Sequence, residues 1–373
     1  MQRAILASGF RIFFVLAAIH ALVTMTFWSA ILHFRPLGSL ALSPVDWHAH
    51  EMIFGYGMAV VAGFLLTAVR NWTGLPTCNG LPLGGLAGLW IAARVLLLTG
   101  SVRGVQIAFV CDLIFQLLLL VAVLVPIVKA RQGRHAAICI ILIALIVCNI
   151  LFYRGATRVA TISGLYLLVG LILVMASRVL PFFTSKRVAN YAAWRSIWLE
   201  RLLAPVFIAF WICELRNLSS AAAACAGLLS LMLAIVLWGW YTHAIWRQPM
   251  LWVLHLAYGF IVLGFGLRAV SGTTLGLHAL AAGGIGLMTV GMMIRVTLGH
   301  TGRDVSAPTR LVPWIFGSMT AAALLRVIGP LIWPGPFLAW IAVSQLFWAA
   351  AFVGFLVVLA GPLCQPRADG KPG

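Results

Sequence analysis

Histidines are the residues of this sequence best suited to do chemistry, because a neutral imidazole is a common ligand of haem iron and other metals. The densest cluster is His48, His50 and Glu51 within the segment WHAHEM. Helix positions two apart point about 200° apart, so the two rings are expected to serve two centres rather than to grip one ion. Glu51 is the candidate proton acceptor, or it orients a ring. Two solvated rings at the membrane surface are the alternative interpretation.

Further histidines are grouped by their expected depth in a membrane. His278 begins an apolar run at the depth of the WHAHEM pair and completes a predicted outer site. His255 and His300 lie near the opposite membrane face and form a predicted inner site. His20 lies in the middle of the first apolar run and is singled out by burial alone. A lone histidine in a membrane helix more often makes a helix–helix hydrogen bond, and that alternative stays open for each of them.

Other ionisable groups in the apolar runs are candidates because each costs about 2.5–3.5 kcal/mol at the centre of a membrane helix. Arg178 and Arg295 lie at matching depth, and guanidinium groups there suit the carboxylates of haem propionates. Arginines that extend to the membrane surface without a specific partner are the alternative. Arg94 is expected to form a buried polar tie with Asp112 and Gln116.

Apolar runs must position these side chains. The 373 residues are 63% hydrophobic and only 9% charged, whereas a soluble domain carries roughly 25% charged residues. Long apolar runs predict an all-α, polytopic integral membrane helix bundle of about twelve transmembrane helices, because lipid requires each backbone to satisfy its own polar groups. The runs lie near 11–34, 48–68, 81–100, 104–128, 135–153, 157–183, 199–217, 221–243, 250–270, 275–296, 311–332 and 337–362.

Charge distribution indicates the topology. Basic residues gather in alternate loops, for example Lys129, Arg131 and Arg134 after the fourth run, which predicts that both termini are cytoplasmic. We expect one transmembrane domain over 1–373, built from two six-helix halves, 1–190 and 191–373. The excess of 25 Lys and Arg over 7 Asp and Glu does not indicate nucleic-acid binding, because no water-facing basic module carries it. Seven cysteines without a CxxC pair indicate neither a disulfide framework nor a zinc site.

Five dispersed segments resemble the NnrS family in order and spacing. They are WHAHEM (47–52), AGFLLTAVRNWTG (62–74), SRVLPFFT (177–184), LWVLHLAYG (251–259) and HALAAGGIGLMTVGMMIRVTLGHTGR (278–303). The resemblance implies a bacterial inner-membrane protein that contains haem, of the b type, and copper, and that is associated with denitrification and nitrosative stress. It places ligands at His48, His50, His255, His278 and His300. Ser177 and Arg70 depart from the family pattern, where glycine and proline are expected.

The leading functional hypothesis is therefore a membrane protein that binds haem and copper and handles nitric oxide or protects against it. Its sharper version is an oxidoreductase of the nitric oxide reductase type, which needs a membrane or periplasmic electron donor. The sequence has no copper-selective run of Cys or Met, so copper would need imidazole ligands. A proton- or metal-coupled transporter or channel is the alternative, and an assembly partner of a respiratory complex is a third hypothesis.

Overall fold

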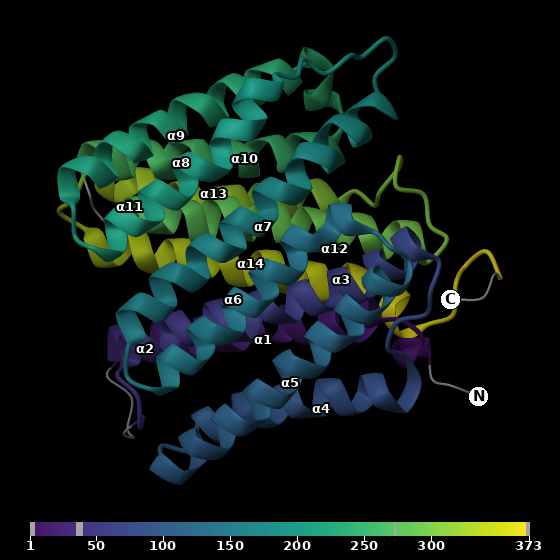
Figure 1. The fold of residues 1–373 in the computed structure, drawn as a ribbon, viewed down its shortest axis with the longest axis horizontal. Helices are drawn as coiled ribbons and strands as arrows, with labels where there is room; N and C mark the ends of the chain where they lie inside the picture. Colours follow the sequence, from purple (N-terminus) through teal and green to yellow (C-terminus); the bar gives the residue numbers. More distant parts are fainter. Residues whose placement is uncertain (1–3, 35–39, 272–273, 371–373) are drawn as a thin grey trace. The chain divides into compact units, whose positions relative to one another are not determined.

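The computed structural model describes residues 4–34, 40–271 and 274–370, and it is built from helices joined by short turns (Figure 1). No strand occurs among these residues. Eleven helical segments are long and apolar enough to cross a membrane, and they coincide with eleven of the twelve predicted runs. The remaining run forms a helix of 19 residues that includes Glu200, Arg201 and Glu214, which gives it the highest share of charged residues among the twelve. The prediction that both termini lie on one side depends on this helix crossing as well.

The chain divides into two compact units, each discontinuous in sequence. Unit 1 comprises Met1–Leu168, Met293–Val305 and Phe352–Gly373. In it α1 packs against α3, α3 and α4 pack against α5, and α5 packs against α6. Its segments are η1 (Ala4–Leu6), α1 (Gly9–Phe34), α2 (Pro44–His50), η2 (Glu51–Gly57), α3 (Met58–Thr73), α4 (Gly80–Leu97), α5 (Val102–Lys129), η3 (Gly133–His135) and α6 (Ala136–Tyr153).

Unit 2 comprises Val169–Met292 and Ser306–Ala351. In it α9 packs against α8 and α10, while η5 packs against α10 and α13. Its segments are α8 (Ile197–Leu215), α9 (Ser219–Trp240), η4 (His243–Arg247), α10 (Pro249–Ser271), α11 (Thr274–His278), η5 (Ala279–Gly286) and α13 (Leu311–Ile332). Three helices contribute residues to both units, namely α7 (Thr157–Ser185), α12 (Leu287–His300) and α14 (Phe337–Cys364).

The second span begins with a well-capped short helix. The hydroxyl of Ser43 accepts the backbone N–H of Asp46 at 3.1 Å, and Pro44 fills the first helical position. Both residues are favoured at helix starts, where backbone N–H groups lack partners within the helix. Directly after His50 the helix widens into the π-helical segment η2. Such segments are rare and occur frequently at functional sites.

The span that contains α11, η5 and α12 repeats this build. Its short α-helix ends at His278, and the π-helical segment η5 follows directly. Both spans then continue as α-helices that end at a Thr-Gly pair, where Gly74 and Gly302 adopt φ values of 69° and 73°. Glycine is favoured in this left-handed conformation because glycine has no Cβ. The sequence pattern predicted the two helices but neither π-helical segment.

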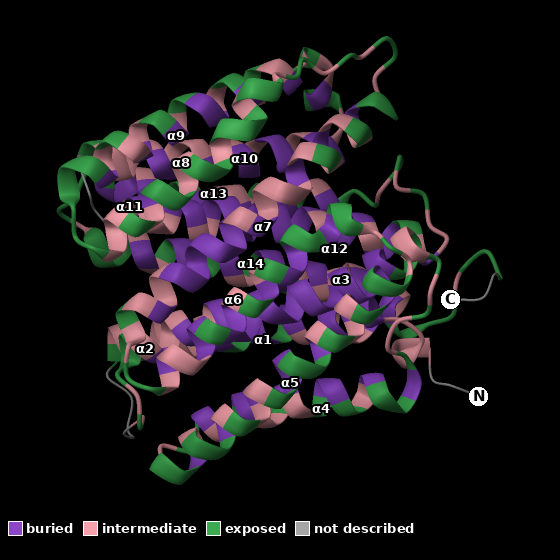
Figure 2. Cartoon of the chain, viewed as in Figure 1, coloured by how far each residue is buried: buried purple, intermediate pink, exposed green. Residues whose placement is uncertain are grey.

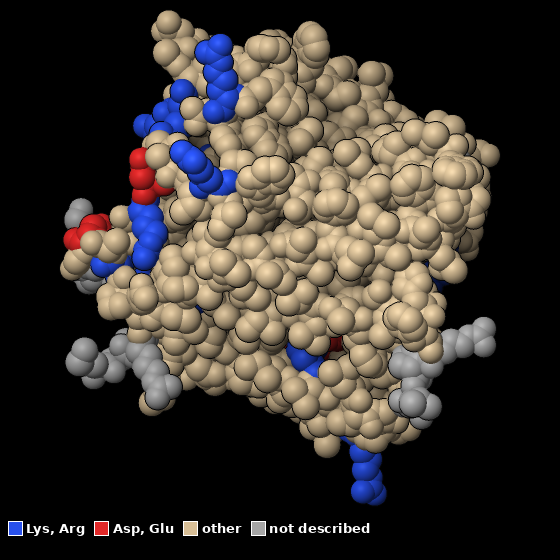
Figure 3. All heavy atoms as spheres, turned by 180° about the vertical axis from the view of Figure 1, so that it is seen from behind, with Lys and Arg blue, Asp and Glu red and all other residues tan. Residues whose placement is uncertain are grey.

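Helix surfaces differ in burial along the chain (Figure 2). Most residues of α3 are buried, whereas α4 and α5 carry exposed residues along one side (Figure 2). Many exposed residues of α5 are large and apolar, including Val110, Ile114, Leu118 and Val121. One face of the molecule shows few charged side chains over most of its area (Figure 3). Such a surface suits hydrocarbon rather than water.

The end of α5 forms a Schellman motif, the usual glycine-containing stop of a helix. The backbone N–H of Gln132 donates to the carbonyl of Ile127 at 3.0 Å, and that of Arg131 donates to the carbonyl of Val128 at 3.0 Å. Arg131 adopts φ 51°, a conformation that costs a residue with a Cβ roughly 1–2 kcal/mol. The chain therefore has an arginine at a position where glycine would be more stable.

Arg11 connects the first and last spans of unit 1. The side chain is 1% exposed, and its Nη1 donates to the backbone carbonyls of Leu363 and Gln365 at 3.1 and 2.6 Å. The last carbonyls of a helix have no partners within it, so the guanidinium satisfies part of the end of α14.

Candidate functional site

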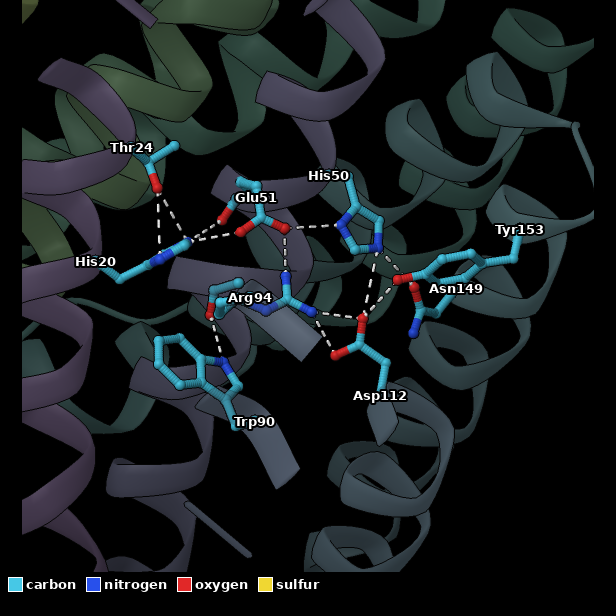
Figure 4. A network of polar contacts seen from close by, with 10 residues as sticks. His20, Thr24, His50, Glu51, Trp90, Arg94, Asp112, Asn149 and Tyr153 are labelled. Carbon is cyan, nitrogen blue, oxygen red and sulfur yellow. Dashed lines mark hydrogen bonds and ion pairs between the residues drawn. The ribbon is translucent and has the colours of Figure 1, made fainter. Parts of the chain in front are cut away.

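A buried network of polar side chains joins six helical segments of unit 1 (Figure 4). The side chains point toward one another from segments that are far apart in the sequence. Its members are His20 and Thr24 of α1, His50 of α2, Glu51 of η2, Trp90 and Arg94 of α4, Asp112 of α5, and Asn149 and Tyr153 of α6. Glu51, Arg94 and Asp112 are 1%, 5% and 0% exposed.

Arg94 lies at the centre and binds two carboxylates. Its Nη1 donates to Oε1 of Glu51 at 2.5 Å, and its Nη2 donates to both carboxylate oxygens of Asp112 at 2.5 Å. Removing ions from water is costly, and only close pairing with further hydrogen bonds offsets the cost. With both carboxylates ionised, the three side chains sum to one negative charge.

His50 is enclosed on all sides. Its Nδ1 lies 3.1 Å from Oε1 of Glu51, and its Nε2 lies 3.0 Å from Oδ1 of Asn149 and 3.8 Å from Oδ2 of Asp112. The ring is 0% exposed, and its centroid lies 4.4 Å from that of Phe152. Both ring nitrogens therefore have polar partners. A ligand role for His50 would require the ring to leave at least one of them.

His20 extends the network to α1. Its Nε2 lies 3.3 Å from Oε2 of Glu51 and 3.2 Å from the hydroxyl of Thr24. The His20 ring can approach the backbone of η2 because residue 55 is glycine: a Cβ there would lie only 2.4 Å from His20 Nε2 and 3.2 Å from Arg94 Nη1. The carbonyl of Gly55 accepts the indole N–H of Trp90 at 3.1 Å.

Two side chains of α6 complete the network from the far side. The Tyr153 hydroxyl donates to Asp112 Oδ2 at 2.9 Å, and Asn149 faces His50. The amide nitrogen of Asn149 is buried and has no hydrogen-bond partner among the described residues. Neither amide atom of Gln116 has one, although Gln116 is 1% exposed.

The predicted tie between Arg94 and Asp112 is confirmed, whereas Gln116 does not join it by a hydrogen bond. The cost of burying charges led to this prediction. Sequence reasoning missed Asn149 and Tyr153, because neither side chain carries a charge whose burial in the membrane would require a partner. An amide in the otherwise apolar run 136–153 was the available signal for Asn149.

The other predicted histidines of unit 1 have different surroundings. His48 stacks on Trp28, with ring centroids 4.4 Å apart and an interplanar angle of 9°, so it faces α1 while His50 faces α6. This divergence agrees with the helical spacing of the pair. His300 is half-buried, and its ring lies 5.6 Å from that of Phe10.

Unit 2 holds the remaining two predicted histidines, each with Nδ1 placed to donate to the carbonyl four residues earlier. His255 Nδ1 lies 2.9 Å from Leu251 O, and His278 Nδ1 lies 2.9 Å from Thr274 O. The Nε2 of His278 accepts an N–H of Arg326 at 2.9 Å. The Nε2 of His255 is buried and has no hydrogen-bond partner among the described residues.

The predicted arginines also belong to different units. Arg295 is 8% exposed and lies in the part of α12 that belongs to unit 1. Arg178 is exposed and lies in the part of α7 that belongs to unit 2. The propionate-binding roles of both residues stay predictions, as do the outer and inner histidine groupings.

The predicted histidines differ in how well they are placed to bind haem iron or copper. His255 fits a haem ligand, because the bond from Nδ1 orients the ring and leaves the lone pair of Nε2 for a metal, as in many haem and metal sites. The described residues contain no group of three His, Cys, Asp or Glu side chains that could hold a metal ion. A copper site is therefore not assembled within them, and we assign no chemical step to copper.

Comparison with known proteins places the chain in one family. A family model described as NnrS protein matches residues 4–367, nearly the whole chain. A search of curated proteins gives no match.

Proposed function

The chain belongs to the NnrS family of nitric oxide-related membrane proteins, and from this premise we propose that it binds haem and acts on nitric oxide. Family membership supports the nitric oxide connection, and eleven candidate spans support the membrane location. The cofactor and the reaction are the proposed part.

The arrangement of His255 carries the proposal. The side chain is 6% exposed, so its Nε2 is removed from water, and a buried polar atom without a partner is costly. The backbone of Trp240 interacts with the ring but makes no hydrogen bond with Nε2 by geometry, and a carbonyl has no proton to donate to the Nε2 lone pair. Coordination to haem iron would satisfy this nitrogen.

A bound haem would supply the iron at which nitric oxide binds. Binding alone would remove the gas and protect the cell. Reduction of two molecules of nitric oxide to nitrous oxide and water consumes two electrons and two protons, so the reductase version requires an external electron donor. In either version His255 would hold and orient the haem.

The test compares His255→Ala with His243→Ala, because His243 is exposed and lies outside the spans. Purified wild type and His243→Ala should show a Soret band that shifts on addition of nitric oxide. His255→Ala should lose most of the haem and regain absorbance when free imidazole is added. A colourless wild-type protein, or full haem content in His255→Ala, would contradict the proposal.

A proton-coupled transporter is the second candidate, and the network around Arg94 favours it. Two buried carboxylates share one guanidinium there, and buried ionisable groups in membrane helices often mark proton pathways. In proteoliposomes with a pH-sensitive dye, a transporter would move protons, and Glu51→Gln would abolish the flux. A haem-containing protein with no such flux would exclude this candidate.

A further inference from the structure

The cleft between the ends of α5 and α6 has features of a lipid site. It is a groove of about 400 Å³ that is lined mostly by apolar side chains. Leu124 and Ile127 of α5 form one wall, and Cys139, Ile140 and Ile143 of α6 form the other. Lining residues from 136 to 143 extend over roughly 10 Å at 1.5 Å per residue. In a bilayer, an open groove of this kind on spanning helices faces hydrocarbon chains.

A basic turn lies at one end of the groove, whose own surface is almost entirely apolar. Arg131 lines it, and the turn KARQGRH (129–135) contains three cations and no acidic residue. Arg131 also has the left-handed conformation that favours glycine. The chain thus places a cation beside the groove at a position where a side chain costs backbone stability.

The turn is held in place by the end of α3. The amide of Gln132, which also lines the groove, donates to the Trp72 carbonyl at 3.2 Å. The His135 ring stacks on Trp72 with centroids 4.2 Å apart. The basic end of the groove is therefore positioned before any ligand arrives, which lowers the entropy cost of binding.

We propose that this groove binds an anionic phospholipid, with an acyl chain between α5 and α6 and the phosphate at Arg131. Basic pockets between membrane helices are known to hold anionic headgroups, and the apolar walls match an acyl chain. The proposal is independent of haem and of nitric oxide.

The experiment measures lipid binding to the purified full chain by native mass spectrometry in a neutral detergent. Dioleoyl phosphatidylglycerol and dioleoyl phosphatidylcholine are compared, because they share acyl chains and differ in headgroup charge. Wild type should bind the anionic lipid more tightly, and inorganic phosphate should not compete at equal concentration.

Arg131→Gly removes the charge while relieving the backbone, so the protein should remain folded. It should weaken phosphatidylglycerol binding roughly fivefold, the contribution of one basic residue near a membrane surface, and Arg131→Lys should restore most of it. Ile140→Trp fills the groove and should weaken binding of both lipids.

Two control variants separate this site from general effects. Arg134→Gln removes a cation from the same turn but not from the groove lining, and should change binding little. Asn217→Gly changes another left-handed residue, with φ 55°, outside the groove. Equal losses in Arg134→Gln and Arg131→Gly would overturn the proposal, as would wild-type binding by Arg131→Gly. Dimers that persist without lipid and disappear in Ile140→Trp would also overturn it, since a second copy would then occupy the groove.

Discussion

Replacing Arg94 by glutamine should destabilise unit 1 strongly, because it leaves two buried carboxylates without their shared cation. Removal of one partner from a buried ion pair costs about 3–5 kcal/mol. Glu51 Oε1 and Asp112 Oδ1 each lie 2.5 Å from a terminal nitrogen of Arg94. The two carboxylates are therefore about 6 Å apart, and their repulsion is about 3 kcal/mol at an effective dielectric constant of 20.

The same energies predict that the effect of Asp112→Asn on stability changes sign between wild type and the Arg94→Gln variant. In wild type, Asp112→Asn weakens hydrogen bonds from Arg94 and Tyr153 and should cost about 1–3 kcal/mol. In the Arg94→Gln background it removes the repulsion and should stabilise the protein by about 3 kcal/mol. Repulsion between the two carboxylates explains why one substitution would destabilise wild type and stabilise the Arg94→Gln variant.

The free energy of unfolding would be measured in mixed detergent micelles by tryptophan fluorescence, with exposed Arg103→Gln as the control. Wild type should be the most stable and Arg94→Gln the least stable, with Asp112→Asn and the double variant between them. Additive effects of the two substitutions would refute the charge argument, because independent sites give no coupling energy.

Two further outcomes follow from the structure. Gly55→Ala should cost about 1–3 kcal/mol, as overpacking does, because the new methyl group meets His20; Gly88→Ala, where a Cβ meets nothing within 4 Å, should be neutral or slightly stabilising in the same unfolding assay. Burial raises the pKa of the Cys78 thiol above its usual value of 9.0, so its reactive thiolate is scarce at neutral pH and increases as the pH rises. Maleimide should therefore label Cys78 more slowly than exposed Cys364 at pH 7. Comparable labelling rates would contradict the claim that burial raises the pKa of the Cys78 thiol.

The helices were predictable to within about five residues at each end, because lipid requires every spanning segment to satisfy its own backbone polar groups. The run near 311–332 and the helix Leu311–Ile332 coincide, since apolar length and turn residues determine both ends. The helix Ile197–Leu215 is the least typical of the predicted spans, because charges at both of its ends reduce its apolar length.

The candidate site was only partly predictable. The pairing of Arg94 with Asp112 follows from the cost of isolated charges in a membrane. The partners of His50 depend on which faces of α2 and α6 meet, and the π-helical segment after His50 changes the phase of the helix at that point. A sequence pattern with a period of 3.6 residues contains no information about this change, so Asn149 and Tyr153 were missed.

The discontinuity of unit 1 has a consequence for its biogenesis. All members of the polar network lie between His20 and Tyr153, so they can meet once the ribosome has delivered the first five spans to the membrane. Arg11 forms its hydrogen bonds later, since the carbonyls that it binds belong to residues 363 and 365. Throughout most of synthesis this guanidinium therefore lacks its final partners, which exist only after residues 363 and 365 have been made.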